Sequence, residues 1–229
     1  MLKTLYDAFQ HWSEKGSVYV YSDTHFEDSD CKLMDPNWIT PEEQVNIINN
    51  LVHKNDTLIL LGDVGNVEWV KKIKAGHKVL ITGNHDAGAE NYKRKKYTVF
   101  TNGRTIKELK NRYKDLIYID NEDFYPSAYC DNKLFDEVYT GPLMISDKII
   151  LSHEPIPNIN WALNIHGHDH GGKGGHLFLG NYYNVCSNTI NYTPINLKDI
   201  INSGILNQID SLHRITIDNA TAKSIKKKK

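Results

Sequence analysis

Short apolar runs that each end abruptly in polar residues dominate the first third of the chain. Three of these runs have the length of buried strands, namely residues 18–21, 57–61 and 78–82. The last two are almost continuously apolar, as strands of a parallel sheet are. Thr40, followed by proline and two glutamates, predicts the start of a helix that runs to about His53, and we expect a second helix over 67–75. The repeated order of strand, polar loop and helix predicts a parallel α/β core.

The pattern changes beyond residue 90. Residues 91–114 contain nine basic residues and one acidic residue, and we expect a basic helical insertion there. Further on, the pattern predicts short strands at 116–119, 137–140 and 148–151, with a turn at 145–148. Residues 195–213 are expected to be helical, and the Lys-rich residues 223–229 to form a flexible tail. The length of the chain then predicts a single domain over residues 1–229 that includes this insertion and tail.

Composition and charge narrow the class of protein. Hydrophobic residues make up 40% of the chain, which allows a sizeable core, and 27 basic against 28 acidic residues exclude a uniformly basic nucleic-acid coat. No apolar run reaches the roughly 18 residues of a membrane span, and no secretory signal is evident. We therefore expect a cytoplasmic protein without a membrane partner. The three cysteines lack the spacing of a disulfide framework or a thiolate zinc site, and we interpret them as free thiols.

Histidine is the unusual component, because five of the eleven histidines lie in short loops that also contain Asp, Asn or Gly. The predicted strand ends supply seven side chains that can bind metal: Asp23, His25, Asp63, Asn84, His153, His168 and His170. Ligands of open α/β sheets collect at the carboxyl ends of the strands, so these side chains are expected to lie together. Imidazole and carboxylate ligands suit Mn, Fe, Zn or Ni. Seven such ligands fill two metal sites if one of them bridges, which predicts a dimetal phosphoester hydrolase.

The order of the motifs adds a resemblance to a known family. Five motifs follow one another as they do in calcineurin-like metallophosphoesterases: Asp23-x-His25, Gly62-Asp63, Gly83-Asn84-His85-Asp86, His153 and Gly167-His168-x-His170. The chain resembles that superfamily over residues 18 to about 200, and within it most resembles small bacterial and phage phosphohydrolases. The resemblance implies a four-layer αββα sandwich with a dimetal site at the carboxyl ends of the strands.

The resemblance also implies a role for each ligand. One metal ion would take Asp23, His25, His170 and the bridging Asp63, and the other would take Asp63, Asn84, His153 and His168. His85 would face the phosphate as a catalytic residue, while a hydroxide that bridges the metals attacks phosphorus in line. Mn²⁺ is the expected metal, with Fe, Zn or Ni as alternatives.

One position departs from the pattern of the superfamily's protein phosphatases. They have an aspartate that orients the catalytic histidine where this chain has Asn66, and an amide stabilises imidazolium less than a carboxylate does. The Arg-Gly that follows in those enzymes is also missing. We therefore expect neither a protein phosphatase nor a dinucleoside-tetraphosphate hydrolase. We expect Asn66 and Asp86 to orient the site residues without binding metal themselves.

Two alternatives to a small-ester hydrolase stay open. A nuclease would use the basic stretch after the Gly83 loop to follow a phosphate backbone, with four candidate contacts: Lys93, Arg94, Lys95 and Lys96. The plainer interpretation of that stretch is an exposed Lys-rich helix. The second alternative is a non-catalytic metal-binding scaffold, which is disfavoured because none of the expected ligands has been lost. The choice between phosphomonoesters and phosphodiesters, and the oligomeric state, stay open.

Overall fold

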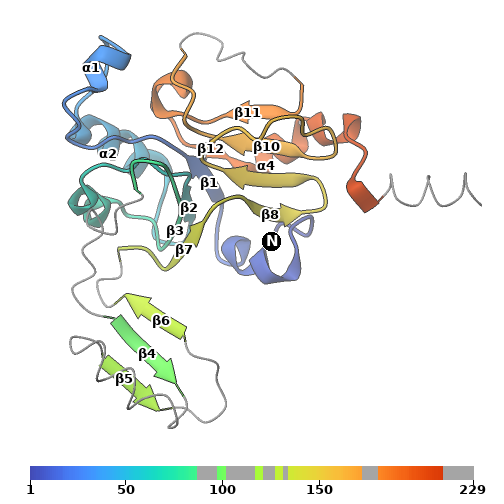
Figure 1. The fold of residues 1–229 in the computed structure, drawn as a ribbon, viewed down its shortest axis with the longest axis horizontal. Helices are drawn as coiled ribbons and strands as arrows, with labels where there is room; N and C mark the ends of the chain where they lie inside the picture. The colour runs from blue at the N-terminus through green and yellow to red at the C-terminus, as the bar shows by residue number, and fades with distance from the viewer. Residues whose placement is uncertain (87–96, 102–116, 121–126, 131–133, 172–179, 214–229) are drawn as a thin grey trace, which may run out of the picture.

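The computed structural model of the chain describes residues 1–86, 97–101, 117–120, 127–130, 134–171 and 180–213. Two sheets lie face to face (Figure 1). The first sheet has the order β12 (Ile195–Asn196), β1 (Val18–Tyr21), β2 (Thr57–Leu60), β3 (His77–Thr82) and β7 (Glu137–Thr140). The second has the order β11 (Tyr182–Asn184), β10 (Leu163–His166), β9 (Ile149–Ser152) and β8 (Leu143–Ser146). Only β12 and β8 run antiparallel to their neighbours, so the predicted parallel α/β core is confirmed.

Alternating side chains explain why the sheets stack. In β1, Val18 and Val20 face the second sheet and join Ile149 and Ile165 in the central core. The other side of the first sheet presents Leu58 and similar residues to a second core. A strand can serve two cores in this way because successive side chains point to opposite faces of the sheet.

Helices cover the outer face of the first sheet. The helix α2 (Pro41–Leu51) begins with a capping box, in which the Thr40 hydroxyl accepts from the Glu43 backbone N–H and the Glu43 carboxylate accepts from the Thr40 N–H. The 3₁₀ helix η2 (Val67–Lys72) packs beside it in place of the expected helix over 67–75. On the outer face of the second sheet, the described segment 156–162 packs against Ile150. These layers form the expected sandwich of sheets between outer elements.

The remaining helices in the described part of the chain are short. They are η1 (Asp7–Ser13), α1 (Cys31–Met34), η3 (Ser187–Ile190), α4 (Leu197–Asn202) and η4 (Ile205–Gln208). In place of the expected helix over 195–213, the structure has the strand β12, the short helices α4 and η4, which Gly204 with a φ of 85° separates, and helical residues again at 212–213. The turn expected at 145–148 is also shorter than predicted, since Ile145 and Ser146 end β8.

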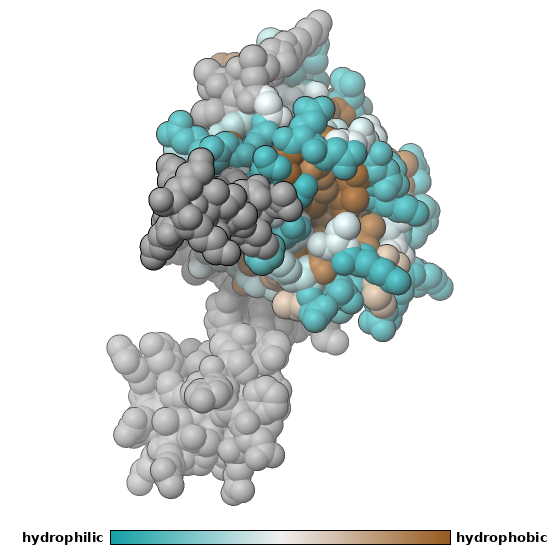
Figure 2. Space-filling view, turned by 90° about the vertical axis from the view of Figure 1, so that its right-hand side faces the viewer, coloured by the Kyte–Doolittle hydropathy of each residue, from teal (hydrophilic) through white to brown (hydrophobic). Residues whose placement is uncertain are grey.

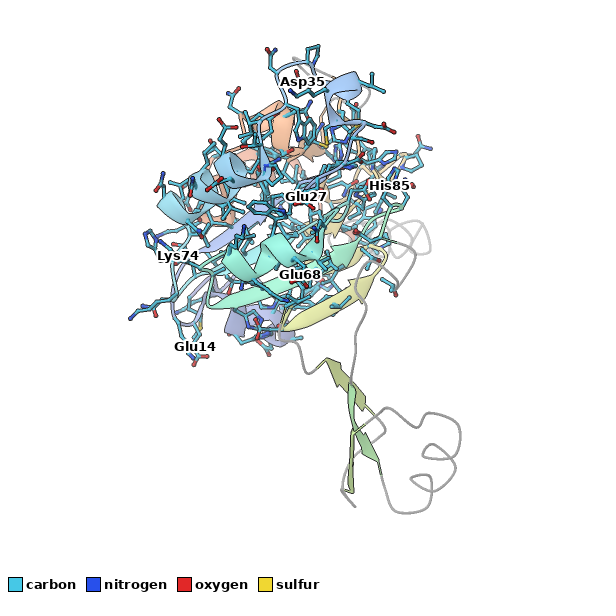
Figure 3. The ribbon with its side chains drawn as sticks, turned by 90° about the vertical axis from the view of Figure 1, so that its left-hand side faces the viewer. Glu14, Glu27, Asp35, Glu68, Lys74 and His85 are labelled. Atoms are coloured by element: carbon cyan, nitrogen blue, oxygen red, sulfur yellow. The ribbon has the colours of Figure 1, made fainter. Side chains whose placement is uncertain are left out.

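The prediction of a helical insertion over 91–114 is wrong in part. Residues 97–101 form the strand β4 (Tyr97–Thr101), which pairs with β5 (Ile117–Asp120) and β6 (Ser127–Cys130) in a third sheet. Figures 1 and 3 show this small sheet apart from the two large ones. A run of β-branched and aromatic residues from 97 to 101 favours a strand even between basic segments. The other residues of the insertion and the tail at 223–229 lie outside the described residues.

Figure 2 shows one face of the molecule, on which mostly polar residues surround a central group of hydrophobic ones. Within the described part of the chain, no helix is long and apolar enough to cross a membrane. Cys31 and Cys186 are buried free thiols, as the sequence predicts.

Candidate metal centre

Loops from both large sheets meet at the edge where β1, β2, β3, β9 and β10 end. His153 follows β9, and its Nδ1 lies 2.8 Å from the carbonyl oxygen of Leu61, which follows β2. His168 follows β10 and Asp23 follows β1, and the His168 backbone N–H donates a hydrogen bond of 2.9 Å to Asp23 Oδ2. These two contacts join the sheets, so the expected ligands of one sheet face those of the other.

The backbone at this edge is held in an unusual conformation. Asp23, His25, Asp63 and His168 have φ values of 56°, 41°, 50° and 65°, in the left-handed region that L-residues rarely adopt. Each such residue costs of the order of 1–3 kcal/mol and persists only where its surroundings fix it. Hydrogen bonds of 3.0 Å from Asp23 N to Gly62 O and from His25 N to Asp63 O provide that support. Four of the seven expected ligands thus lie in backbone strain that is typical of functional sites.

The first group of metal-ligating atoms consists of Asp23 Oδ1, His25 Nε2 and His170 Nε2. Asp23 Oδ1 lies 3.4 Å from His170 Nε2 and 3.9 Å from His25 Nε2. Both Asp23 Oδ1 and His25 Nε2 are buried and have no hydrogen-bond partner. Since an unpaired buried polar atom is costly, these two atoms fit a cation placed between them.

The second group surrounds the side chain of His153. Its Nε2 lies 2.7 Å from Asn84 Oδ1, 3.1 Å from His168 Nδ1 and 3.4 Å from Asp63 Oδ2. Asp63 Oδ2 also lies 3.7 Å from His25 Nε2 in the first group. A single carboxylate oxygen therefore lies between the two groups, where a bridging ligand must be.

The opposite ring nitrogens of three histidines are bonded to oxygen. His25 Nδ1 lies 3.0 Å from Asp28 Oδ2, and His170 Nδ1 lies 3.0 Å from Asn188 Oδ1. His153 Nδ1 lies 2.8 Å from the carbonyl oxygen of Leu61. These oxygens accept a hydrogen bond from a proton on Nδ1, which leaves the lone pair on Nε2 facing the site. Sequence reasoning missed Asp28 and Asn188. Only Asp28 offers a signal, because it shares a loop with His25.

In Asp23 and Asp63, one carboxylate oxygen accepts hydrogen bonds from the protein and the other faces the candidate metal site. Asp23 Oδ2 accepts from the Cys186 thiol at 3.2 Å as well as from His168, which leaves Oδ1 for the site. Asp63 Oδ1 accepts from the His85 backbone N–H at 2.9 Å, which leaves Oδ2 between the groups. Asp86, expected to support the ligands, accepts from the backbone N–H groups of Asp63 and Gly83, each at 2.8 Å.

The electrostatics of the site favour positive charge. Burial opposes ionisation of Asp23, but the imidazole of His170, with its Nε2 3.4 Å from Asp23 Oδ1, and the charge of His153 outweigh it and hold the pKa of Asp23 below its usual value. Burial likewise opposes protonation of His153, yet the hydrogen bond and charge of Asp63, together with Asp23, raise its pKa to about 9. Protons and metal ions therefore compete for the same buried place.

The other predicted residues lie around this centre. His85 is exposed, with its ring centre 5.7 Å from that of His25, and Figure 3 places it at the edge of the molecule. The Asn66 side chain donates to Glu27 and accepts from the Glu68 N–H at 3.1 Å, so its orienting effect on His85 stays a prediction. The basic candidates, Lys93, Arg94, Lys95 and Lys96, lie outside the described residues. The structure thus brings all seven expected ligands together, and metal binding by them stays a prediction.

Comparison with known proteins shows which family the chain matches. A model of the calcineurin-like phosphoesterase family matches residues 16–173. No curated protein matches the chain. Among solved structures, a protein of unknown function from Aquifex aeolicus is 20% identical with a TM-score of 0.49, over 81% of this chain and 98% of that one. The Pseudomonas putida nuclease MPE is 20% identical with a TM-score of 0.37, over 67% of this chain and 60% of that one.

Proposed function

Because the chain belongs to the calcineurin-like phosphoesterase family, we propose that it hydrolyses phosphomonoesters or phosphodiesters with two bound divalent metal ions. The position of Asp63 Oδ2, within 3.7 Å of a ligating nitrogen in each group, is the observation that most supports two ions with a shared ligand. Mn²⁺ is the ion we propose, and Fe, Zn or Ni would suit the same imidazole and carboxylate ligands. The cytoplasmic location stays a prediction from the sequence.

The side chains that would hold the ions fall into two sets. The first ion would take Asp23, His25, His170 and the shared Asp63. The second would take Asp63, Asn84, His153 and His168. When bound, the ions would supply Lewis acidity, which lowers the pKa of water and neutralises charge on the phosphate.

Burial of the ligands indicates where a substrate would approach. Asp23, His25 and His153 are buried and form the floor of the site, whereas Asn84 and His168 are exposed. His85 is exposed beside Asn84, so a phosphate group entering from solvent would meet His85, Asn84 and His168 before the buried ligands. We propose that the imidazole of His85 donates a hydrogen bond or proton to phosphate oxygens as charge shifts in the transition state.

Metal content measured together with hydrolysis of an aryl phosphate ester tests this function. After loading with Mn²⁺, we expect about two Mn²⁺ ions per chain in the wild type, none in Asp63→Ala, and chiefly one lost in His153→Ala. Asp147→Ala, which removes an exposed carboxylate, is the control and should behave like the wild type. A wild-type chain with no metal and no turnover with any divalent ion would contradict the proposal.

The two alternatives differ in what supports them. A nuclease activity would depend on the basic residues 93–96, for which the support is the charge pattern of the sequence. A scaffold without catalysis would not need exposed ligands beside an exposed His85, so the open side of the site favours an enzyme.

A further inference from the structure

A second group of metal-ligating side chains lies at the other end of the parallel strands. His77 is the first residue of β3 and Glu137 the first of β7, while His11 belongs to η1. At 3.3 Å per residue, the length of β3 separates His77 from the end beside the proposed metal centre by about 17 Å. In Figure 3, Glu14 and Lys74, which flank this group in sequence, lie at an edge away from His85.

The three side chains converge on one carboxylate oxygen. Glu137 Oε1 lies 2.6 Å from His11 Nε2 and 2.6 Å from His77 Nε2, and the three ligand atoms all lie within 4.8 Å of one another. The two imidazole rings are nearly perpendicular, at 87°, and their centres lie 5.6 Å apart. The side chains of His11, His77 and Glu137 are 45%, 30% and 19% exposed, which leaves the group open to ions from solvent.

We propose that His11, His77 and Glu137 form a further metal site that binds Zn²⁺, with water as the fourth ligand. Two imidazoles and one carboxylate are a ligand set that zinc takes in tetrahedral sites, with metal–ligand distances of about 2.0–2.2 Å. Such distances place neighbouring ligand atoms about 3.3 Å apart, so each nitrogen would move outward by about 0.7 Å. His11 is the most exposed of the three and lies on a short 3₁₀ helix, which allows this movement.

The surroundings of Glu137 fix the carboxylate in place for a cation. Trp12 Nε1 donates to Oε1 at 2.9 Å and the Tyr139 hydroxyl to Oε2 at 2.5 Å. Burial alone would raise the pKa of Glu137, but the hydrogen bonds from His77, Tyr139, His11 and Trp12 lower it to about 2. The carboxylate is therefore ionised at neutral pH. On binding zinc, a protonated imidazole would release its Nε2 proton to solvent, and a neutral one would exchange its Nε2 proton for one on Nδ1.

The charges around His77 are mixed. Asp136 Oδ2 lies 3.7 Å from His77 Nδ1, where it favours a proton on that nitrogen and leaves Nε2 for a metal. Lys15 acts on His77 in the opposite sense. Because His11 belongs to η1 and the other two ligands to the first sheet, a bound ion would attach the N-terminal segment to β3 and β7. This site is independent of the proposed hydrolysis.

Zinc content of the full chain tests the proposal. The wild type and three variants are freed of metal, equilibrated with Zn²⁺ and freed of excess ions, and bound zinc is then measured by mass spectrometry. His11→Gln and His77→Gln retain an N–H donor for Glu137 but lose the imidazole ligand. His53→Gln is the matched control, because His53 is an exposed histidine whose Nδ1 lies 3.6 Å from the Asp56 carboxylate.

We expect His11→Gln and His77→Gln each to bind one Zn²⁺ per chain fewer than the wild type, and His53→Gln to bind the same number. Both test variants should keep the circular dichroism spectrum of the wild type, since glutamine retains the hydrogen bond to Glu137. Equal zinc counts in all four proteins would overturn the proposal. An equal loss in His53→Gln would also overturn it, because it would show unspecific binding at surface histidines.

Discussion

Replacing Gly83 with alanine would disturb the proposed metal centre by contact alone. A Cβ atom at this position would lie 2.2 Å from Asp63 Oδ1, 2.7 Å from Asp63 N and 2.9 Å from His153 Cε1. Ordinary carbon contacts begin at about 3.4 Å, so Asp63 Oδ1 or the Gly83 loop must move by about 1.2 Å. Metal–ligand distances tolerate only about 0.2 Å, so Asp63 would no longer reach both ions.

We expect Gly83→Ala to lose most of its bound metal and to hydrolyse an aryl phosphate ester at least about 100-fold more slowly, since a misplacement of about 1 Å costs that much. Gly141→Ala is the control, because a Cβ there would have nothing within 4 Å although its φ of 87° is strained for alanine. Such strain costs about 1–2 kcal/mol of stability without touching the site. Metal content, rate and melting temperature are measured for both variants. A Gly83→Ala protein with wild-type metal content and rate would refute the close packing of Asp63 and its bridging position.

Four further predictions concern single interactions. Asp28→Asn should weaken metal binding about 10–100-fold, because Asp28 orients the ring of His25, and titration with Mn²⁺ would measure it. His85→Ala should lower kcat by about 10²–10⁴ with metal content unchanged, and more for poor leaving groups than for good ones; an equal loss for all leaving groups would exclude an acid role. Replacing Lys93, Arg94, Lys95 and Lys96 with serine should weaken oligonucleotide binding and flatten its salt dependence, and unchanged binding would exclude the nuclease alternative. In metal-free protein, Glu137→Gln should lower the free energy of unfolding by a smaller amount as the pH falls from 4.5 toward about 2. The lowered pKa of Glu137 stabilises the wild type fully above the unfolded-state pKa of 4.5, and this stabilisation is lost as the pH falls to the folded-state pKa of about 2. A difference between the two proteins that does not change with pH would contradict this.

The strands β1, β2, β3, β7 and β9 could be predicted because each is a short apolar run with a polar end, whereas β12 falls in the expected helix over 195–213 and β8 overlaps the expected turn at 145–148. Val18–Tyr21 and Glu137–Thr140 have the predicted bounds. The strand Tyr97–Thr101 could not be predicted in the same way, because the dense basic charge on both sides of it suggested one continuous helix. Its partners are also far away in sequence, and a three-stranded sheet depends on those pairings more than on local preference.

The proximity of the seven expected ligands could be predicted because they follow strands whose ends meet at one edge. The groups that orient them could not be predicted. Asn188 meets His170 and the Leu61 carbonyl meets His153 only after the loops have packed, and neither residue type signals a metal site in sequence. Asn66 shows the same limit, since the contacts observed for its side chain are with Glu27 and Glu68.

The most direct test of the proposed metal centre is anomalous diffraction from crystals of the full chain loaded with Mn²⁺. The account predicts two peaks about 3.5–4 Å apart at the carboxyl ends of the strands, both within bonding distance of the Asp63 carboxylate. One peak would also contact Asp23, His25 and His170, and the other Asn84, His153 and His168. A single peak, or two peaks that do not share Asp63, would contradict the account.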